Sequence, residues 1–242
     1  MKIKFYLLSL IVISLSIFFP EAYVFSQDTT KKIIKVTITA EKLRGEEGAK
    51  IIHLENKIKI QQGEMTLTAM EGVFYTENKI IMLSGEVTFT RPGSTIKGDK
   101  VIVYQDRQFG AWEGHVKFVQ QKIPDSNSDN TKVKNALQDG PVTLTCDTLE
   151  FYWGKTVKAI AKGNVRAIQK DKSFSSDVVT YTEKPQILIL EGNIILGEQK
   201  GMTMTCDKLT LYIKEERVQA EGLANKGGRV EFRIPLKPKK DK

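Results

Sequence analysis

The sequence predicts an all-β protein, an antiparallel β-jelly roll assembled from about six copies of one structural repeat. Three observations predict it: a motif that recurs at a spacing of 29 or 30 residues, apolar residues that alternate with period two, and a recurring glycine. A fixed period of this length is typical of stacked units, none of which can bury its apolar face alone. We therefore expect an elongated molecule whose function runs along its length.

Two columns of residues anchor the repeat. Small residues form the first column, at Ala40, Ala69, Gly98, Cys146, Ser176 and Cys206. The second column follows 16 or 17 residues later, at Asn56, Gly85, Gly114, Gly163, Gly192 and Gly222. Each repeat therefore carries two fixed points. The alternation of apolar and polar residues around them predicts the secondary structure.

The stretch around the small residue predicts a bent strand. In the fourth repeat, Val142 and Leu144 lie four and two positions before Cys146, whereas Leu149 and Phe151 lie three and five positions after it. Alternation with period two is typical of a strand. The change of parity turns the second half to the other face unless the strand bends or bulges at the small residue.

The stretch around the glycine predicts a second strand that returns after a polar turn. In the fifth repeat, Leu188 and Leu190 precede Gly192, and Ile194 and Leu196 follow it with the same parity. A missing side chain lets the backbone bend sharply at this point. Each repeat is therefore predicted to hold two long antiparallel strands, which gives about twelve bent strands in six repeats.

Stacked bent strands predict two sheets that meet along a crease and enclose an apolar trough. A last apolar run from Arg229 to Ile234 is expected to add a further edge strand. The alternative architecture is a right-handed parallel β-solenoid, whose coils close in three short segments rather than in two long ones.

The chain divides into a signal peptide at 1–26, one repeat domain at 27–236 and a basic tail at 237–242. The signal peptide is predicted because Lys2 and Lys4 precede an apolar run from Phe5 to Phe19, with a small residue at Ser26. Export to the periplasm is expected, and an uncleaved segment would anchor the chain in the inner membrane. A Ser/Asn/Asp-rich stretch at 121–140 interrupts the period and predicts a loop at the rim of the trough.

The two cysteines are predicted to be unpaired. Cys146 and Cys206 hold the same position two repeats apart, hence four strands apart, or roughly 19 Å at about 4.8 Å per strand. A disulfide needs Cα atoms within about 7 Å.

The sequence contains no recognisable catalytic motif, and it predicts no enzyme, no metal and no cofactor. His53 and His115 have no second histidine or cysteine at ligand spacing. Aspartate follows the small residue in several repeats, and a residue repeated along a stack is rarely a unique active site. The net charge of +8 favours an acidic partner. Signatures of nucleic-acid recognition are absent, which leaves anionic lipid as the better candidate.

The predicted trough is the feature of the fold that points to a function. A trough of this kind either holds acyl chains or is a dry core filled by its own side chains. Its predicted lining residues, which are the candidate lipid-binding residues, are Leu67, Phe74, Val103, Phe118, Leu144, Phe151, Phe174, Leu190, Met204 and Leu211.

The glycine column carries a resemblance to a known family. The units Gly85-Glu-Val, Gly163-Asn-Val and Gly192-Asn-Ile each follow a small residue by about 16 positions, and this pattern resembles the LptA/OstA family of periplasmic lipopolysaccharide-transport proteins. The likeness extends from about Val36 to Leu223. It implies a V-shaped jelly roll whose interior holds lipid A acyl chains, domains joined end to end through edge strands, and neither enzymatic activity nor metal.

The resulting hypothesis is a non-enzymatic periplasmic protein that binds lipopolysaccharide and forms part of the bridge from the inner to the outer membrane. Its expected partners are lipopolysaccharide, other jelly-roll components of the bridge, and further copies of itself joined head to tail. Two alternatives stay open. One is an LptC-like component anchored in the inner membrane, and the other is a structural or adhesive β-repeat protein with a filled core.

Overall fold

The computed structural model describes residues 36–46, 48, 50–121, 141–154, 157–198, 201–215, 217–222 and 228–233. The predicted signal peptide, basic tail and nearly all of the rim loop lie outside these residues. Every regular element in the described residues is a β-strand. None of the described segments forms a helix of the length and apolarity that a membrane crossing needs.

Fourteen strands form one sheet. In chain order they are β1 (Val36–Thr39), β2 (Lys42–Glu46), β3 (Ile51–Gln62), β4 (Met65–Tyr75), β5 (Ile80–Arg91), β6 (Ser94–Tyr104), β7 (Phe109–Gln120), β8 (Val142–Tyr152), β9 (Lys158–Gln169), β10 (Lys172–Thr182), β11 (Ile187–Glu198), β12 (Thr203–Tyr212), β13 (Arg217–Glu221) and β14 (Glu231–Arg233).

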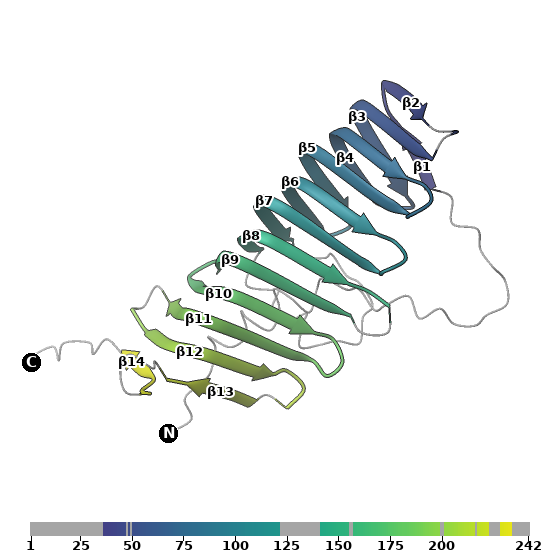
Figure 1. The fold of residues 1–242 in the computed structure, drawn as a ribbon. Coiled ribbons are helices and arrows are strands. Elements are labelled where there is room, and N and C mark those ends of the chain that lie inside the picture. Colours follow the sequence, from purple (N-terminus) through teal and green to yellow (C-terminus); the bar gives the residue numbers. More distant parts are fainter. Residues whose placement is uncertain are drawn as a thin grey trace, which may run out of the picture.

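The strands stack in sequence order along one long axis (Figure 1). Every strand from β3 to β12 pairs with its neighbours in the chain, and each of these pairings is antiparallel. The predicted antiparallel jelly roll is confirmed, and the sheet is not closed into a barrel. The parallel-solenoid alternative is wrong, because consecutive strands from β3 to β12 run antiparallel to each other.

The strands at both ends of the stack are broken at the bend. β1 pairs with one half of β3 and β2 with the other. At the other end, β13 pairs with the second half of β12, and β14 pairs with residues 203–205 in its first half. The expected extra strand at residues 229–234 is therefore corrected. Its described part completes the twelfth bent strand instead of adding a thirteenth.

The bend itself is a β-bulge that recurs in every long hairpin. Between β9 and β10, Gly163 and Asn164 both lie opposite the single residue Asp177. Two residues opposite one is the definition of a bulge, which bends the strand that carries the extra residue. Both bulged residues are left-handed, with φ of 74° and 49°. A parity change at the small residue and a sharp bend at the glycine were both predicted, and both are present.

We call these bulges together the crease. Its left-handed pairs are Asn56–Lys57, Gly85–Glu86, Gly114–His115, Gly163–Asn164 and Gly192–Asn193. The second residue of a pair often binds a carboxylate on the preceding strand. Asn164 Nδ2 donates to Asp147 Oδ2 at 2.9 Å, and Asn193 Nδ2 donates to Asp177 Oδ2 at 2.9 Å. The repeated aspartate is therefore part of the crease.

The crease divides each long strand into two arms. Arm A contains the halves next to the turns at 63–64, 92–93 and 170–171, and arm B contains the halves next to the turns at 76–79, 105–108 and 183–186. Side chains from both arms form a single hydrophobic cluster. Phe118 and Phe174 enter it from arm A, and Leu149 and Leu188 enter it from arm B. The core thus lies inside the bend, between the arms.

Replacing a crease glycine should destabilise the fold more than replacing a turn glycine. A Cβ on Gly163 would lie 2.2 Å from Asp147 Oδ2, whereas a Cβ on Gly63 would have nothing within 4 Å. Both glycines have positive φ, so Gly63→Ala measures the backbone cost alone, about 1 kcal/mol. Gly163→Ala adds the steric cost, and we expect about 2–4 kcal/mol in total. Urea unfolding of both variants measures the difference, and equal losses would contradict this account of the crease.

Candidate functional site

The ten predicted trough residues all lie on the inward face of the bent sheet. Five of them are at most 1 % exposed: Phe118, Leu144, Phe174, Leu190 and Leu211. Four are half-buried and pack against the same cluster: Leu67, Val103, Phe151 and Met204. Phe74 is half-buried and lies directly across from Ile52 and Ile81, which pack against the cluster. The structure therefore brings this set together along one interior surface.

The middle of the trough is filled by its own side chains. Phe118 and Leu144 are cross-strand partners, as are Leu144 and Ala167, and Ala167 and Phe174. All four are at most 1 % exposed. Toward the N-terminal end the interior is looser, since Ile60 and Leu67 in the equivalent row are only half-buried. The protein's own side chains therefore exclude water from the middle of the interior more completely than from its N-terminal end.

A row of mainly polar side chains at the inner rim of arm A was not predicted from the sequence. Its members are Arg91, Ser94, Gln120 and Val142, joined by cross-strand pairing, and the pair Gln169 and Lys172; the pairing of Thr143 with Ile168 places Val142 and Gln169 next to each other. We call this row the polar rim. Its signal was in the sequence, because the residue six positions after the glycine column is polar at Gln62, Arg91, Gln120, Gln169 and Glu198. The predicted strands were assigned from apolar positions alone, so this polar column was not recognised.

The polar rim is buried, although it consists mainly of polar groups. Ser94, Gln120, Gln169 and Lys172 are between 1 % and 7 % exposed. Arg91 Nε donates to Ser94 Oγ at 2.6 Å, and burial lowers the pKa of Arg91 from its ordinary value. Gln120 Nε2 donates to the carbonyl of Gln121 at 3.3 Å, while its Oε1 has no partner among the described residues.

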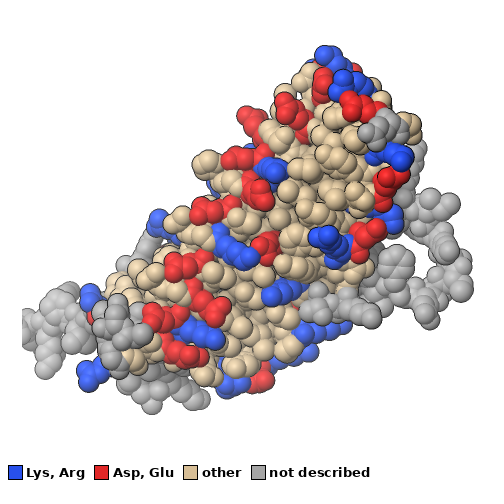
Figure 2. Space-filling view, viewed as in Figure 1, with Lys and Arg blue, Asp and Glu red and all other residues tan. Residues whose placement is uncertain are grey.

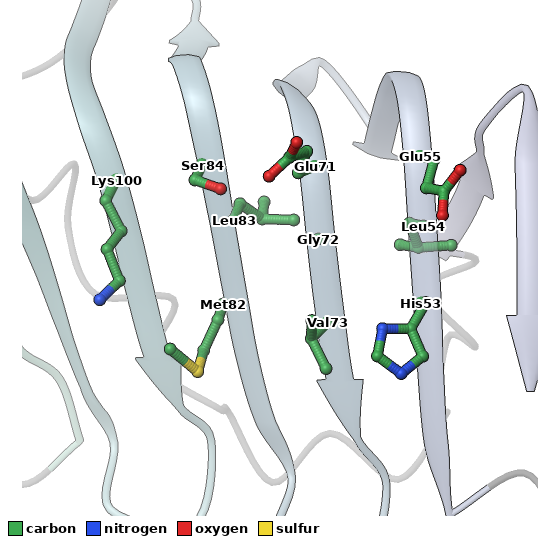
Figure 3. A pocket seen from close by; sticks show the side chains of 10 residues that line it. All are labelled: His53, Leu54, Glu55, Glu71, Gly72, Val73, Met82, Leu83, Ser84 and Lys100. Carbon is green, nitrogen blue, oxygen red and sulfur yellow. The ribbon is translucent and has the colours of Figure 1, made fainter. Parts of the chain in front are cut away.

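A hollow of about 300 Å³ lies on the outer face of arm B, outside the trough. Figure 3 shows His53, Val73 and Met82 in one row across β3, β4 and β5, with Lys100 extending alongside from β6. Lys100 Nζ lies 3.8 Å from Glu113 Oε2. Within the described segments, no group of three histidine, cysteine or acidic side chains is placed to hold a metal ion. The hollow therefore resembles a depression in a charged surface more than a reaction centre.

The charged side chains on the viewed face are mixed in sign. Figure 2 shows acidic and basic residues interspersed, with large areas of uncharged surface between them. Among the described residues, charged side chains next to the turns form ion pairs, such as Lys50 with Glu77 at 2.9 Å and Lys79 with Asp106 at 2.8 Å. The net charge of +8 therefore does not form a basic patch on this face.

The two cysteines are free and buried, as predicted. Both lie on the inward side of the crease, in β8 and β12. Burial raises the pKa of Cys146 to about 12 and that of Cys206 to about 11, with smaller contributions from Asp147 and Asp207. The thiols therefore stay protonated at neutral pH and act as small apolar side chains.

His115 is the titratable member of the crease. Its Nδ1 lies 2.8 Å from Asp99 Oδ2, and the side chain is largely exposed. The hydrogen bond and charge of Asp99 raise the pKa of His115, and Asp147 contributes further in the same direction. A pKa that folding raises stabilises the protein below the unfolded-state pKa, and this stabilisation is lost as pH rises through the folded-state pKa.

Removing the Asp99 charge should lower the pKa of His115 toward its ordinary value. Asp99→Asn deletes the largest cause of the upward shift, and NMR titration of the His115 ring measures the result. Asp177→Asn is the matched control, because this carboxylate belongs to the same crease but binds Asn193. A His115 pKa that is the same in parent and Asp99→Asn protein would refute the pairing.

Comparison with known proteins decides the family. The family model described as LptA/(LptD N-terminal domain) LPS transport protein matches residues 71–217, more than half of the chain. The chain belongs to this family. The resemblance predicted from the glycine column is therefore confirmed.

The other comparisons do not bear on the family assignment. No curated protein matches this chain. Among solved structures, the chain is similar to LptH, the LptA homologous periplasmic component of the lipopolysaccharide transport device from Pseudomonas aeruginosa. That match has 11 % identity and a TM-score of 0.28, and covers 84 % of this chain and 96 % of the other.

Proposed function

We propose that this protein binds lipopolysaccharide in the periplasm and carries it, chemically unchanged, as one section of the bridge between the inner and outer membranes. The observation that carries the proposal is the apolar inward surface, which continues from β3 to β12 in a chain of the LPS-transport family. An amphiphile that moves along such a surface keeps its acyl chains out of water at every step.

Partition of acyl chains supplies the driving force. Burial of apolar surface contributes about 25 cal/mol per Å², so a long acyl chain gains several kcal/mol by leaving water. The filled middle of the interior implies that the arms separate as lipid enters. The polar head stays at the open mouth, because sugars and phosphates lose their hydration if they enter an apolar core. Transport of this kind makes and breaks no covalent bond.

Both ends of the stack support docking by strand addition. At one end β1 and β2 each pair with β3, and at the other end β13 and β14 each pair with β12, so among the described strands these four leave one edge open. Val36 and Ile38 on β1 are 50 % and 44 % exposed, and Phe232 on β14 is 49 % exposed. Soluble proteins usually protect such edges, and unprotected edges accept a strand from a partner. We therefore assign the ends to contacts with other jelly-roll components of the bridge or with further copies of this chain.

A photo-crosslinker inside the trough should capture lipopolysaccharide, and one on the outer face should not. Phe151 and Tyr152 are consecutive aromatic residues of β8 that point to opposite faces. p-Benzoylphenylalanine fits either position, so the two variants differ only in the face that carries the probe. We expect labelling of lipopolysaccharide in cells from position 151 and little from position 152.

Equal labelling from both positions would overturn the trough as the binding site. Labelling from neither would instead favour a structural repeat protein, the alternative that the filled middle of the core supports. A second inward probe at Phe89 of β5, with Thr90 as its outward control, extends the comparison to the looser end of the interior.

Proline in β14 should weaken end-to-end association. Successive residues of an edge strand point their N–H groups alternately to the inner neighbour and to the free edge. Of the variants Phe232→Pro and Arg233→Pro, one should therefore lose a donor from the free edge and the other a bond to β12. We expect the variant that loses the free-edge donor to reduce association with little effect on the thermal midpoint of unfolding. Light scattering over a concentration series and partner pull-down measure this, and unchanged association in both variants excludes this edge as the docking site.

A further inference from the structure

The polar rim borders an apolar row on the inward face of arm A. On arm A, the row directly below it is apolar and includes Phe89, Phe118 and Phe174, with Ile96 and Leu144 between them. Arg91, Gln120 and Lys172 each lie two positions along a strand from one of these phenylalanines, and hence on the same inward face. Arm A therefore changes from apolar to polar within one row.

In arm B the last inward row within the strands is apolar, and the change to polar residues comes at the turns beyond it. This row consists of Ile52, Phe74, Ile81, Val103, Gly110, Phe151, Ala159, Tyr181, Leu188, Leu211 and Val218, joined by cross-strand pairing. A phenol is the single polar side chain in that row. Beyond this row, backbone hydrogen bonds join turn residues such as Lys50 with Thr76 and Lys79 with Gln105. The two lips therefore differ in where their polar groups lie: within the strands and mostly buried on arm A, and in exposed turns on arm B.

The groups of the polar rim match the chemistry of phosphate. Arginine and lysine donate charge-assisted hydrogen bonds to phosphate oxygens, and the serine hydroxyl and glutamine amides supply neutral donors. Between Arg91 and Lys172 the row carries no carboxylate, and the next residue of the row, Glu198, is the cross-strand neighbour of Lys172. Arg91 and Lys172 lie five strands apart, or roughly 24 Å at about 4.8 Å per strand. The row therefore offers two donor groups along the axis, Arg91–Ser94–Gln120 and Gln169–Lys172.

Burial strengthens such contacts. Ser94 and Gln120 are 4 % and 1 % exposed, and hydrogen bonds to an ion are stronger where water is excluded. The unpartnered Oε1 of Gln120 is an acceptor, so it suits a sugar hydroxyl of the lipid head rather than a phosphate oxygen.

We propose that the polar rim binds the phosphate groups of the lipid head, with Arg91 and Lys172 as the principal donors, while the acyl chains occupy the apolar rows below. This inference rests on the proposed function and adds to it the lip that the head contacts. It orients the bound lipid across the trough, with its charged head toward arm A. Two donor groups along the axis would let a head pass from one to the next as the lipid advances.

Affinity for lipid A with and without its phosphates tests the proposal on the full-length protein. Parent protein should bind bisphosphorylated lipid A more tightly than the same lipid after enzymatic dephosphorylation. Arg91→Gln and Lys172→Gln should each weaken binding of the phosphorylated lipid by about tenfold, the effect expected for one charge-assisted hydrogen bond. Neither variant should change the affinity for the dephosphorylated lipid.

Lys117→Gln is the matched control. Lys117 belongs to β7 like Gln120, but it is exposed on the outer face, so its loss removes one positive charge without touching the rim. Arg91→Lys and Lys172→Arg keep the charge and should bind nearly as the parent does. Thermal unfolding of each variant shows whether the fold persists. If a glutamine variant does not fold, Arg91→Lys and Lys172→Arg still test the proposal.

Each outcome has one interpretation. Selective loss of phosphate-dependent affinity at Arg91 or Lys172, with Lys117→Gln unaffected, supports the proposal. Parent protein that binds both lipids equally, or glutamine variants that lose both lipids alike, overturns it while leaving lipid transport in place. Parent protein that binds neither lipid overturns the proposed function, and the polar rim loses its assignment together with it.

Discussion

The crease is the constraint on which the rest of the structure depends. In the strand that carries the small residue, the inward side chains lie two positions before it and three positions after it, as Leu144 and Leu149 do around Cys146. In a flat strand, side chains five positions apart point to opposite faces. Without the bend, the apolar residues in one half of each such strand would face water. The bulge therefore turns two apolar half-faces into one interior.

Backbone conformation, more than side-chain pairing, holds the crease. Its hydrogen bonds are exposed, and exposed charged pairs contribute little to stability. One repeat does without a carboxylate, because Met70 occupies the place that Asp99 and Asp177 hold elsewhere. The left-handed pair Gly85–Glu86 is nevertheless present beside Met70. Asn56 replaces glycine at the first crease, as a residue that tolerates positive φ better than most.

Most of the fold could be predicted from the sequence because period and parity are local properties. The strands, the bend at Cys146 and Gly192, and the interior position of Phe118 all follow from counting along one repeat. The split terminal strands could not be predicted, since a strand with one neighbour can break at its bend at little cost. The polar rim was missed for another reason. At the mouth of a trough an inward position is no longer wholly apolar, so Gln120 reads as an outward residue until its burial is known.

The distance between the arms cannot be predicted from the alternation of apolar and polar residues, and it bears directly on the lipid binding that we propose. A trough held open would bind acyl chains with the full free energy of their transfer from water, and it would release them slowly. In this structure Leu144 and Leu190 are already shielded from water by the protein itself. Under the proposed function, lipid entry exchanges contacts between the arms for contacts with acyl chains, so the net gain comes mainly from the surface of the lipid. Closure of the arms behind a departing lipid recovers the lost contacts, which lowers the cost of release and suits a site that has to pass its ligand onward.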